Sequence, residues 1–129
     1  MEELHERRSS ALTDVSNAMV ALHKEQFGRG PTKARAQFAG DDVLVCVLRD
    51  VLLPAEHKLV EMGEQGRVRE ARMSFQVATA SDFVAAVEKI LRRKVESFAS
   101  AVDADSNVAF EVFCFEPRDS SSNGQQSPA

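Results

Sequence analysis

The stretch from Gly28 to Leu59 constrains the fold of this chain most, because it combines a helix stop, a hairpin and a helix start. Its glycine-rich opening suits the end of a helix, and Pro31 prevents that helix from resuming. Apolar runs at residues 34–39 and 43–48 then flank Gly40-Asp41-Asp42, a short glycine-containing connection typical of a β-hairpin. Pro54 fits the first turn of a short helix, where its missing N–H has no cost.

The run Val43–Leu48 contains only apolar residues, so both faces of the strand that it predicts are apolar. Such a strand is central in its sheet, and its second face is covered by other elements or by a partner subunit. The last predicted strand, Val108–Phe115, also has two largely apolar faces, with Glu111 as the polar exception. Because large apolar patches rarely stay bare, we expect this excess apolar surface to form a homodimer.

Two further segments have the apolar spacing of helices. From Ser10 onward, one narrow apolar stripe runs through Leu12, Val15, Met19 and Leu22. Its spacing favours packing on the sheet and leaves helix-to-helix dimerisation open. Residues 67–91 keep one helical phase, which favours a single long helix over two helices that meet at Ser81-Asp82. Its predicted stripe comprises Val68, Ala71, Phe75, Ala78, Phe83, Val87 and Ile90.

The predicted order of elements is therefore α-β-β-α-α-β-β, with a final hairpin formed by residues 95–102 and 108–115. Two local hairpins joined by helices predict an α+β fold, a four-stranded antiparallel sheet with helices on one face. We expect a flexible N-terminus at residues 1–9, a single domain at residues 10–117, and a disordered polar tail at residues 118–129.

Charge and hydropathy exclude several classes of protein. The net charge is −4, with 16 basic and 20 acidic residues interspersed, which argues against specific nucleic-acid binding. No apolar run is long enough to cross a bilayer, and the acidic N-terminus does not resemble a signal peptide. We therefore expect a cytoplasmic protein whose contact with the inner face of the membrane, if any, is peripheral.

The sequence offers no arrangement typical of catalysis or metal binding. His5, His23 and His57 are widely separated, and each is predicted to lie at the surface. Cys46 and Cys114 match no zinc spacing and are expected to be buried reduced thiols, with a disulfide between strands as the less favoured alternative. No serine or cysteine has a recognisable His-acid pair. We expect no catalytic residue, no metal and no cofactor.

The glycine-rich loop is the best candidate for a binding site. Its glycines allow a close backbone approach, and Arg29 can bind an oxyanion with its guanidinium fork. The loop lacks the frame of a nucleotide-binding P-loop, so a structural turn is favoured over an anion or partner contact. Arg72 lies near the apolar stripe of the long helix and needs a partner such as Glu56 or Asp50. The candidate binding residues are Gly28, Arg29, Gly30, Pro31, Thr32, Arg35, Glu56 and Arg72.

These features, taken together, resemble the MpsC-like family of small bacterial proteins. The matching parts are Phe27–Thr32, Leu48-Arg49, Leu52–Glu56 with Leu59, Arg72 and Arg93–Val95. The likeness covers about residues 11–117. Leu53 stands where the family often has a capping threonine. Arg92 stands where a glycine often ends the long helix, which suggests a longer final turn here.

The resemblance implies a soluble accessory to the membrane subunits of a proposed cation-translocating, membrane-potential-generating system. It carries over no catalytic residue. Our first hypothesis is thus a non-catalytic, dimeric accessory module that docks on membrane-protein subunits. The alternative is a sensor that holds a small anion or nucleotide between the Gly28–Thr32 loop and Arg72. An enzyme is the least favoured interpretation.

Overall fold

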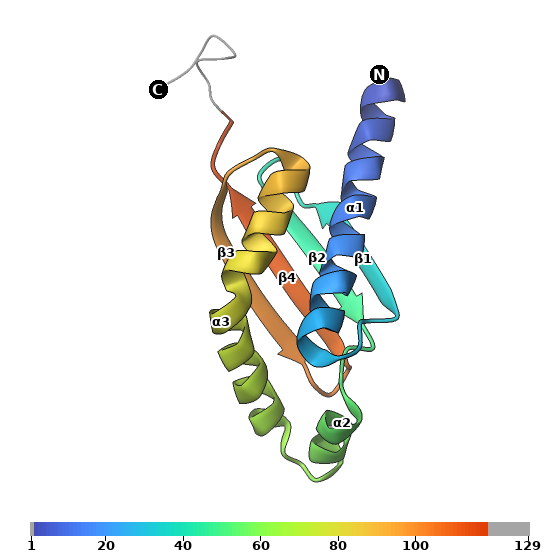
Figure 1. The fold of residues 1–129 in the computed structure, drawn as a ribbon, viewed down its shortest axis with the longest axis vertical. Helices are drawn as coiled ribbons and strands as arrows, with labels where there is room; N and C mark the ends of the chain where they lie inside the picture. Colours follow the sequence, from blue (N-terminus) through green and yellow to red (C-terminus); the bar gives the residue numbers. More distant parts are fainter. Residues whose placement is uncertain (1, 119–129) are drawn as a thin grey trace.

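The computed structural model describes residues 2–118. Its elements are α1 (Glu2–Phe27), β1 (Lys33–Phe38), β2 (Val43–Arg49), α2 (Pro54–Glu61), α3 (Gln65–Leu91), β3 (Val95–Asp103) and β4 (Val108–Phe115) (Figure 1). The predicted α+β class and the order of elements are confirmed. Nearly all of the predicted disordered tail lies outside the described residues.

The four strands form one antiparallel sheet in the order β1-β2-β4-β3. The two hairpins join through β2 and β4, with Val45 opposite Val112 and Cys46 opposite Glu111. The prediction that Val43–Leu48 is a central strand is therefore confirmed. This pairing buries the backbone of the two most apolar strands and leaves the more polar β1 and β3 at the edges.

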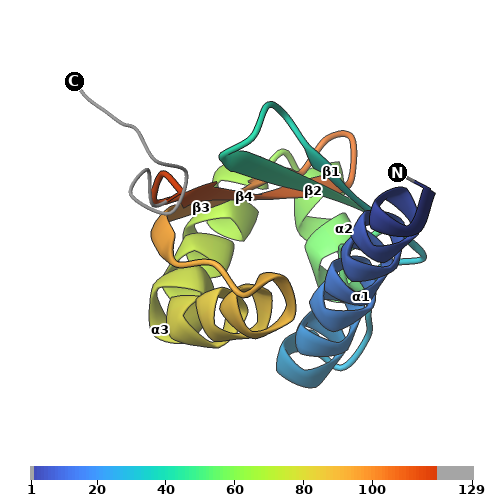
Figure 2. The ribbon, with the colours of Figure 1, turned by 90° about the horizontal axis from the view of Figure 1, so that it is seen from above.

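All three helices lie on the same side of the sheet (Figure 2). α1 packs along β1, α3 packs along β3, and the two long helices contact each other, while α2 packs against α3. No element within residues 2–118 covers the opposite side of the sheet, which we call the open face. The sheet is thus a two-layer structure with one face in the core and one outside it.

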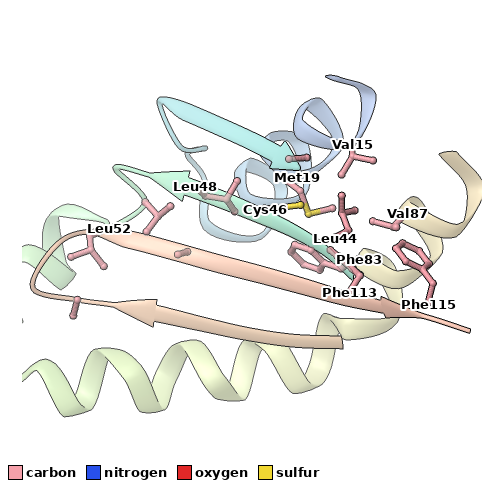
Figure 3. Close-up of a cluster of buried hydrophobic side chains, with 14 of the residues drawn as sticks. Val15, Met19, Leu44, Cys46, Leu48, Leu52, Phe83, Val87, Phe113 and Phe115 are labelled. Atoms are coloured by element: carbon pink, nitrogen blue, oxygen red, sulfur yellow. The ribbon is translucent and has the colours of Figure 1, made fainter. Parts of the chain in front are cut away.

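The core fills the space between the sheet and the long helices (Figure 3). Its largest fully buried side chains include Met19 of α1, Leu44 and Leu48 of β2, and Phe113 and Phe115 of β4. Each such side chain contributes roughly 1.5–3 kcal/mol by its removal from water.

The two cysteines lie on opposite faces of the sheet. Cys46 is fully buried in the core, as predicted, and burial, with a smaller contribution from the nearby Glu111 carboxylate, raises its pKa to about 12. Cys114 is on the open face and is only partly buried, so its predicted full burial was wrong. Both thiols are free, as expected.

The first helix is longer than its apolar pattern predicted. α1 begins at Glu2 rather than at Ser10, and its first residues are exposed. The apolar stripe marks only the part of a helix that packs, whereas Glu, Leu and Arg continue the helix by propensity. Acidic Glu2 and Glu3 also suit the positive end of the helix dipole.

The prediction of a single long third helix is confirmed, but the middle of its buried stripe was wrong. Val68, Phe83 and Val87 are buried, whereas Ala71, Phe75 and Ala78 are exposed. The face toward the sheet runs instead through Arg72, Gln76 and Thr79. Polar residues thus occupy the inner side of α3 midway along the helix. The apolar periodicity of the sequence had predicted buried apolar side chains on this side.

The end of α3 corrects a second expectation. Arg92 takes a left-handed conformation, with φ 57°, and its N–H donates to the carbonyl of Glu88. The helix therefore stops after Leu91, without the longer final turn expected for an arginine at this position. Arg92 adopts the geometry that glycine commonly supplies at a helix end, at some steric cost.

Candidate functional site

The Gly28–Thr32 loop is fixed to the segment that connects β2 with α2. Arg29 donates from Nη1 to the Leu52 carbonyl at 2.7 Å and from Nη2 to Asp50 Oδ2 at 3.1 Å. The hydrogen bond from Arg29 is the main cause that holds the pKa of Asp50 below its usual value.

Both glycines of this loop have conformational reasons to be there. Gly28 has φ +84°, in the left-handed region where glycine has no side-chain clash. A Cβ at Gly30 would lie 3.0 Å from the Val20 carbonyl oxygen, so glycine permits the loop to touch α1. The geometry of the loop therefore favours the structural-turn interpretation.

Arg72 and Glu56 form a buried ion pair on the other side of the same connection. Glu56 accepts from Arg72 Nε at 2.8 Å and from Nη2 at 2.6 Å, and Nη2 also donates to the Val51 carbonyl at 2.9 Å. The side chains are 8% and 13% exposed. The guanidinium stacks on the Phe27 ring at 3.9 Å from its centroid. Of the two acidic partners predicted for Arg72, Glu56 and Asp50, the structure has Glu56 in that position.

Glu56 also holds the start of α2. Its Oε1 accepts from the Leu53 N–H at 2.8 Å, which is the carboxylate half of a capping box, while Leu53 has no hydroxyl to make the other half. Burial alone would raise the pKa of Glu56, but hydrogen bonds from Arg72 and Leu53 and the charge of Arg72 outweigh it and hold the pKa below 4.5. The carboxylate is therefore stabilised in its ionised form.

We expect this lowered pKa to appear as acid sensitivity. A depressed carboxyl pKa contributes stability above the unfolded-state value of 4.5, and that contribution is lost as pH falls through the folded-state value. Urea unfolding measured from neutral pH down through this range will show a flatter pH dependence for Glu56→Gln than for the wild type. Glu61→Gln, which changes an exposed carboxyl of the same helix, will keep the wild-type slope. Equal slopes for all three proteins would contradict the assignment.

The structure brings together most of the predicted binding residues, but their charged groups already have partners. Arg29 and Arg72 both donate to acceptors within the chain, and their charges face Asp50 and Glu56. Arg35 is separate from this group, because it is exposed on the open face of the sheet. These contacts disfavour an anion held between the loop and Arg72, and the sensor hypothesis stays a prediction.

A cavity of about 120 Å³ lies next to this ion pair, between α1, α3 and the inner side of β3 and β4. It reaches the surface beside the exposed residues Arg69 and Met73. The lining residues are His23, Gln26, Phe27, Arg69, Arg72, Met73, Gln76, Thr79, Phe83, Phe98, Ser100, Ala101, Val102, Ala109 and Glu111. The polar middle of α3 thus faces this cavity.

Two buried titratable side chains belong to the lining. His23 Nε2 lies 3.1 Å from Glu111 Oε2, and the side chains are 6% and 4% exposed. The other carboxylate oxygen, Glu111 Oε1, has no hydrogen-bond partner among the described residues, and the same holds for the buried Gln26 Nε2. Buried polar atoms are rarely left unpaired in native proteins, so this unpaired acceptor and this unpaired donor distinguish the cavity from the rest of the core.

The sequence analysis did not identify this cavity. The prediction that His23 lies at the surface was wrong. His23 is on the side of α1 that faces the sheet and is buried there, and its ring contacts Phe83 edge-on at 5.7 Å between ring centroids. Glu111 did stand out as the polar exception in an apolar strand. A single carboxylate in a strand cannot reveal its partner, which lies 88 positions earlier in the chain.

The His23 ring lies between a carboxylate and two aromatic rings. His23 contacts Glu111 on one side and aromatic rings on the other, with centroid distances of 5.7 Å to both Phe27 and Phe83. Within residues 2–118, no three His, Cys, Asp or Glu side chains gather as a metal site would require.

Fold and site together define a small α+β domain with one open sheet face. On the helical side of the sheet it has a cavity whose lining includes the buried His23–Glu111 pair. A sequence model of the family described as "Na+-translocating membrane potential-generating system (MpsC)" matches residues 8–117. The chain belongs to this MpsC family, as its resemblance indicated. Neither the curated proteins nor the solved structures gave a match to the chain. In the described part of the chain, no helix combines the length and apolar character of a membrane span.

Proposed function

We propose that this chain is a non-catalytic accessory domain of a Na+-translocating membrane potential-generating system, that it is a homodimer, and that it acts at the cytoplasmic side of the membrane. The family description supports the link to the system. The open sheet face is the observation that supports a binding role, because an apolar sheet face without cover favours association. The occupant that we propose for it is a second copy of this chain.

The open face has an apolar centre. Val45 and Val47 of β2 lie opposite Val112 and Phe110 of β4, and all four side chains point away from the helices. β3 contributes the small residues Ala99 and Ala101 beside them. Such a surface matches the inner faces of β-sandwiches, in which two sheets stack about 10 Å apart.

Charges at the edges of this face favour one orientation of the second copy. The row at one end of the sheet reads Lys33, Arg49, Val108 and Asp103 from β1 to β3. A two-fold axis parallel to the central strands places β1 of one copy over β3 of the other. Lys33 then faces the partner subunit's Asp103, and Arg35 lies over the small side chain of the partner subunit's Ala101. Opposite charges and complementary sizes thus meet at both edges.

Sedimentation equilibrium tests the dimer directly. We expect the wild type to have twice the chain mass of 14.2 kDa, and Val45→Asp to be monomeric, because a carboxylate at the apolar centre cannot be desolvated without a partner. Val77→Asp is the matched control, since Val77 is 76% exposed on α3 away from this face. A monomeric wild type would contradict the dimer.

Carbodiimide coupling provides a second measurement that needs no destabilising variant. The proposed axis predicts a covalent link between Lys33 of one copy and Asp103 of the other. Lys33→Asp or Asp103→Lys alone will weaken the dimer, and the two changes together will restore it. This orientation would be contradicted by a dimer that forms no Lys33–Asp103 link and whose dissociation constant is the same in the wild type and in the charge-exchange variants.

The accessory role is tested in the source cells. Deletion of the coding sequence is expected to lower the Na+-dependent membrane potential reported by a voltage-sensitive dye. The wild-type chain and Val77→Asp will restore it, and Val45→Asp will not. An unchanged potential after deletion would contradict the link to the translocating system.

A further inference from the structure

We propose that the cavity between α1, α3 and the sheet binds a small organic molecule with a primary ammonium head and an apolar body. Glu111 would receive the ammonium group. This site is independent of the proposed dimer, because it lies on the helical side of the sheet and the dimer would use the other side.

The unpaired oxygen of Glu111 identifies the head group. Oε2 contacts His23, whereas Oε1 is buried and has no partner within residues 2–118, and Glu111 is one of the residues that line the cavity. A carboxylate oxygen is an acceptor, so the missing group is a hydrogen-bond donor. A cationic donor is preferred, because it makes the stronger, charge-assisted bond to a carboxylate.

The walls of the cavity favour the same class of ligand. Phe83 and Phe98 stack at 5.9 Å between ring centroids, and both line the cavity together with Phe27. These rings provide apolar contact for a hydrocarbon body. The volume of about 120 Å³ accommodates a small molecule of this kind.

The nearby arginines do not reverse this preference. Arg72 is neutralised by Glu56 at 2.6 Å and directs its donors to that carboxylate and to a backbone carbonyl. Arg69 lies at the exposed rim, apart from the buried floor. Of the two lining arginines, only Arg69 at the entrance could therefore pair with a negative group on the ligand, such as the carboxylate of an amino acid.

Three probes of nearly equal shape distinguish the possibilities. 3-Methylbutylamine carries only the ammonium group, 4-methylpentanoate carries only a carboxylate, and leucine carries both. Titration into isotopically labelled protein, followed by amide and side-chain chemical shifts, is expected to move signals of the cavity residues with either amine. 4-Methylpentanoate is expected to leave them unchanged.

Variants assign the binding to Glu111. Glu111→Gln keeps the shape of the side chain and is expected to weaken amine binding at least tenfold, whereas Glu70→Gln, the same change at an exposed position of α3, will not. Ser100→Leu keeps Glu111 but fills part of the cavity, and it will also weaken binding. This second variant keeps the test valid if Glu111→Gln does not fold.

Each outcome decides the proposal. If leucine binds more tightly than the plain amine, and Arg69→Gln removes only that difference, the ligand is a zwitterionic amine and the proposal is supported. Tightest binding by the plain amine also supports it. Equal binding of 4-methylpentanoate would overturn it, as would the absence of shifts with any probe, which would mean that the cavity holds only water.

Discussion

Replacement of Arg72 by alanine is expected to lower the free energy of unfolding by about 3–5 kcal/mol. The Glu56 side chain is only 13% exposed, and the change leaves its carboxylate without a charge partner. The change also removes the side-chain donor that binds the Val51 carbonyl. It also removes the cation that stacks on Phe27 at 3.9 Å. A loss of this size is a large fraction of the total stability of a small domain.

Urea unfolding of three further variants isolates the cause. Arg69→Ala, an exposed arginine on the same helix, is expected to change stability by less than about 0.5 kcal/mol. Arg72→Met combined with Glu56→Gln removes both charges and is expected to cost less than Arg72→Ala, because no buried charge is left unpaired. If Arg72→Ala costs no more than Arg69→Ala, the ion pair does not hold α2 and α3 together.

Replacement of Asn107 by alanine is expected to lower the free energy of unfolding by roughly 3 kcal/mol, from lost hydrogen bonds and a strained backbone. Asn107 Oδ1 accepts from the N–H groups of Val51 and Leu52 at 2.8 and 2.9 Å, and both residues are buried. Asn107 also has φ 59°, in the left-handed region that asparagine tolerates better than alanine does.

A comparison of alanine with glycine at position 107 separates the two contributions. Asn107→Gly loses the same hydrogen bonds but has no Cβ, so it is expected to cost about 1 kcal/mol less than Asn107→Ala. Ser106→Ala, a change at an exposed position of the same turn, serves as the control and is expected to be nearly neutral in urea unfolding. Equal losses for glycine and alanine would mean that the backbone conformation carries no cost.

These two side chains bind the connection between β2 and α2 from two different elements. Arg72 reaches it from α3, and Asn107 reaches it from the turn between β3 and β4. Arg29 adds a third contact from the loop after α1, by its bond to the Leu52 carbonyl. The glycine-rich loop and Arg72 were proposed from the sequence as a candidate anion site. In the structure, Arg29 of this loop and Arg72 both donate hydrogen bonds to the irregular segment between β2 and α2.

Local patterns predicted the elements well, since each depends on residues that are close in the chain. The glycine-containing turn and the two-faced apolar run predicted a hairpin with a central strand, and both are present. Arg72 was predicted to need an acidic partner because of its helical phase, and Glu56 is that partner. A burial pattern and a charge together were sufficient for this inference.

The cavity was not predictable in the same way. The apolar period assigned Phe75 to the core of α3, yet it is exposed and meets Phe27 edge-on at 5.6 Å between ring centroids. His23 and Glu111 are each ordinary in their own segments, and only the packing of α1 on the sheet brings them within 3.1 Å.

The sequence by itself determined the order of helices and strands, the antiparallel hairpins and the excess of apolar sheet surface, because these follow from periodicity and turn chemistry within short segments. Only the tertiary structure decided that β2 pairs with β4, that every helix covers the same face, and that a buried carboxylate oxygen in the cavity has no partner among the described residues. The physical reason is that these features arise from contacts between segments far apart in the chain, where the packing of one element sets the surroundings of another.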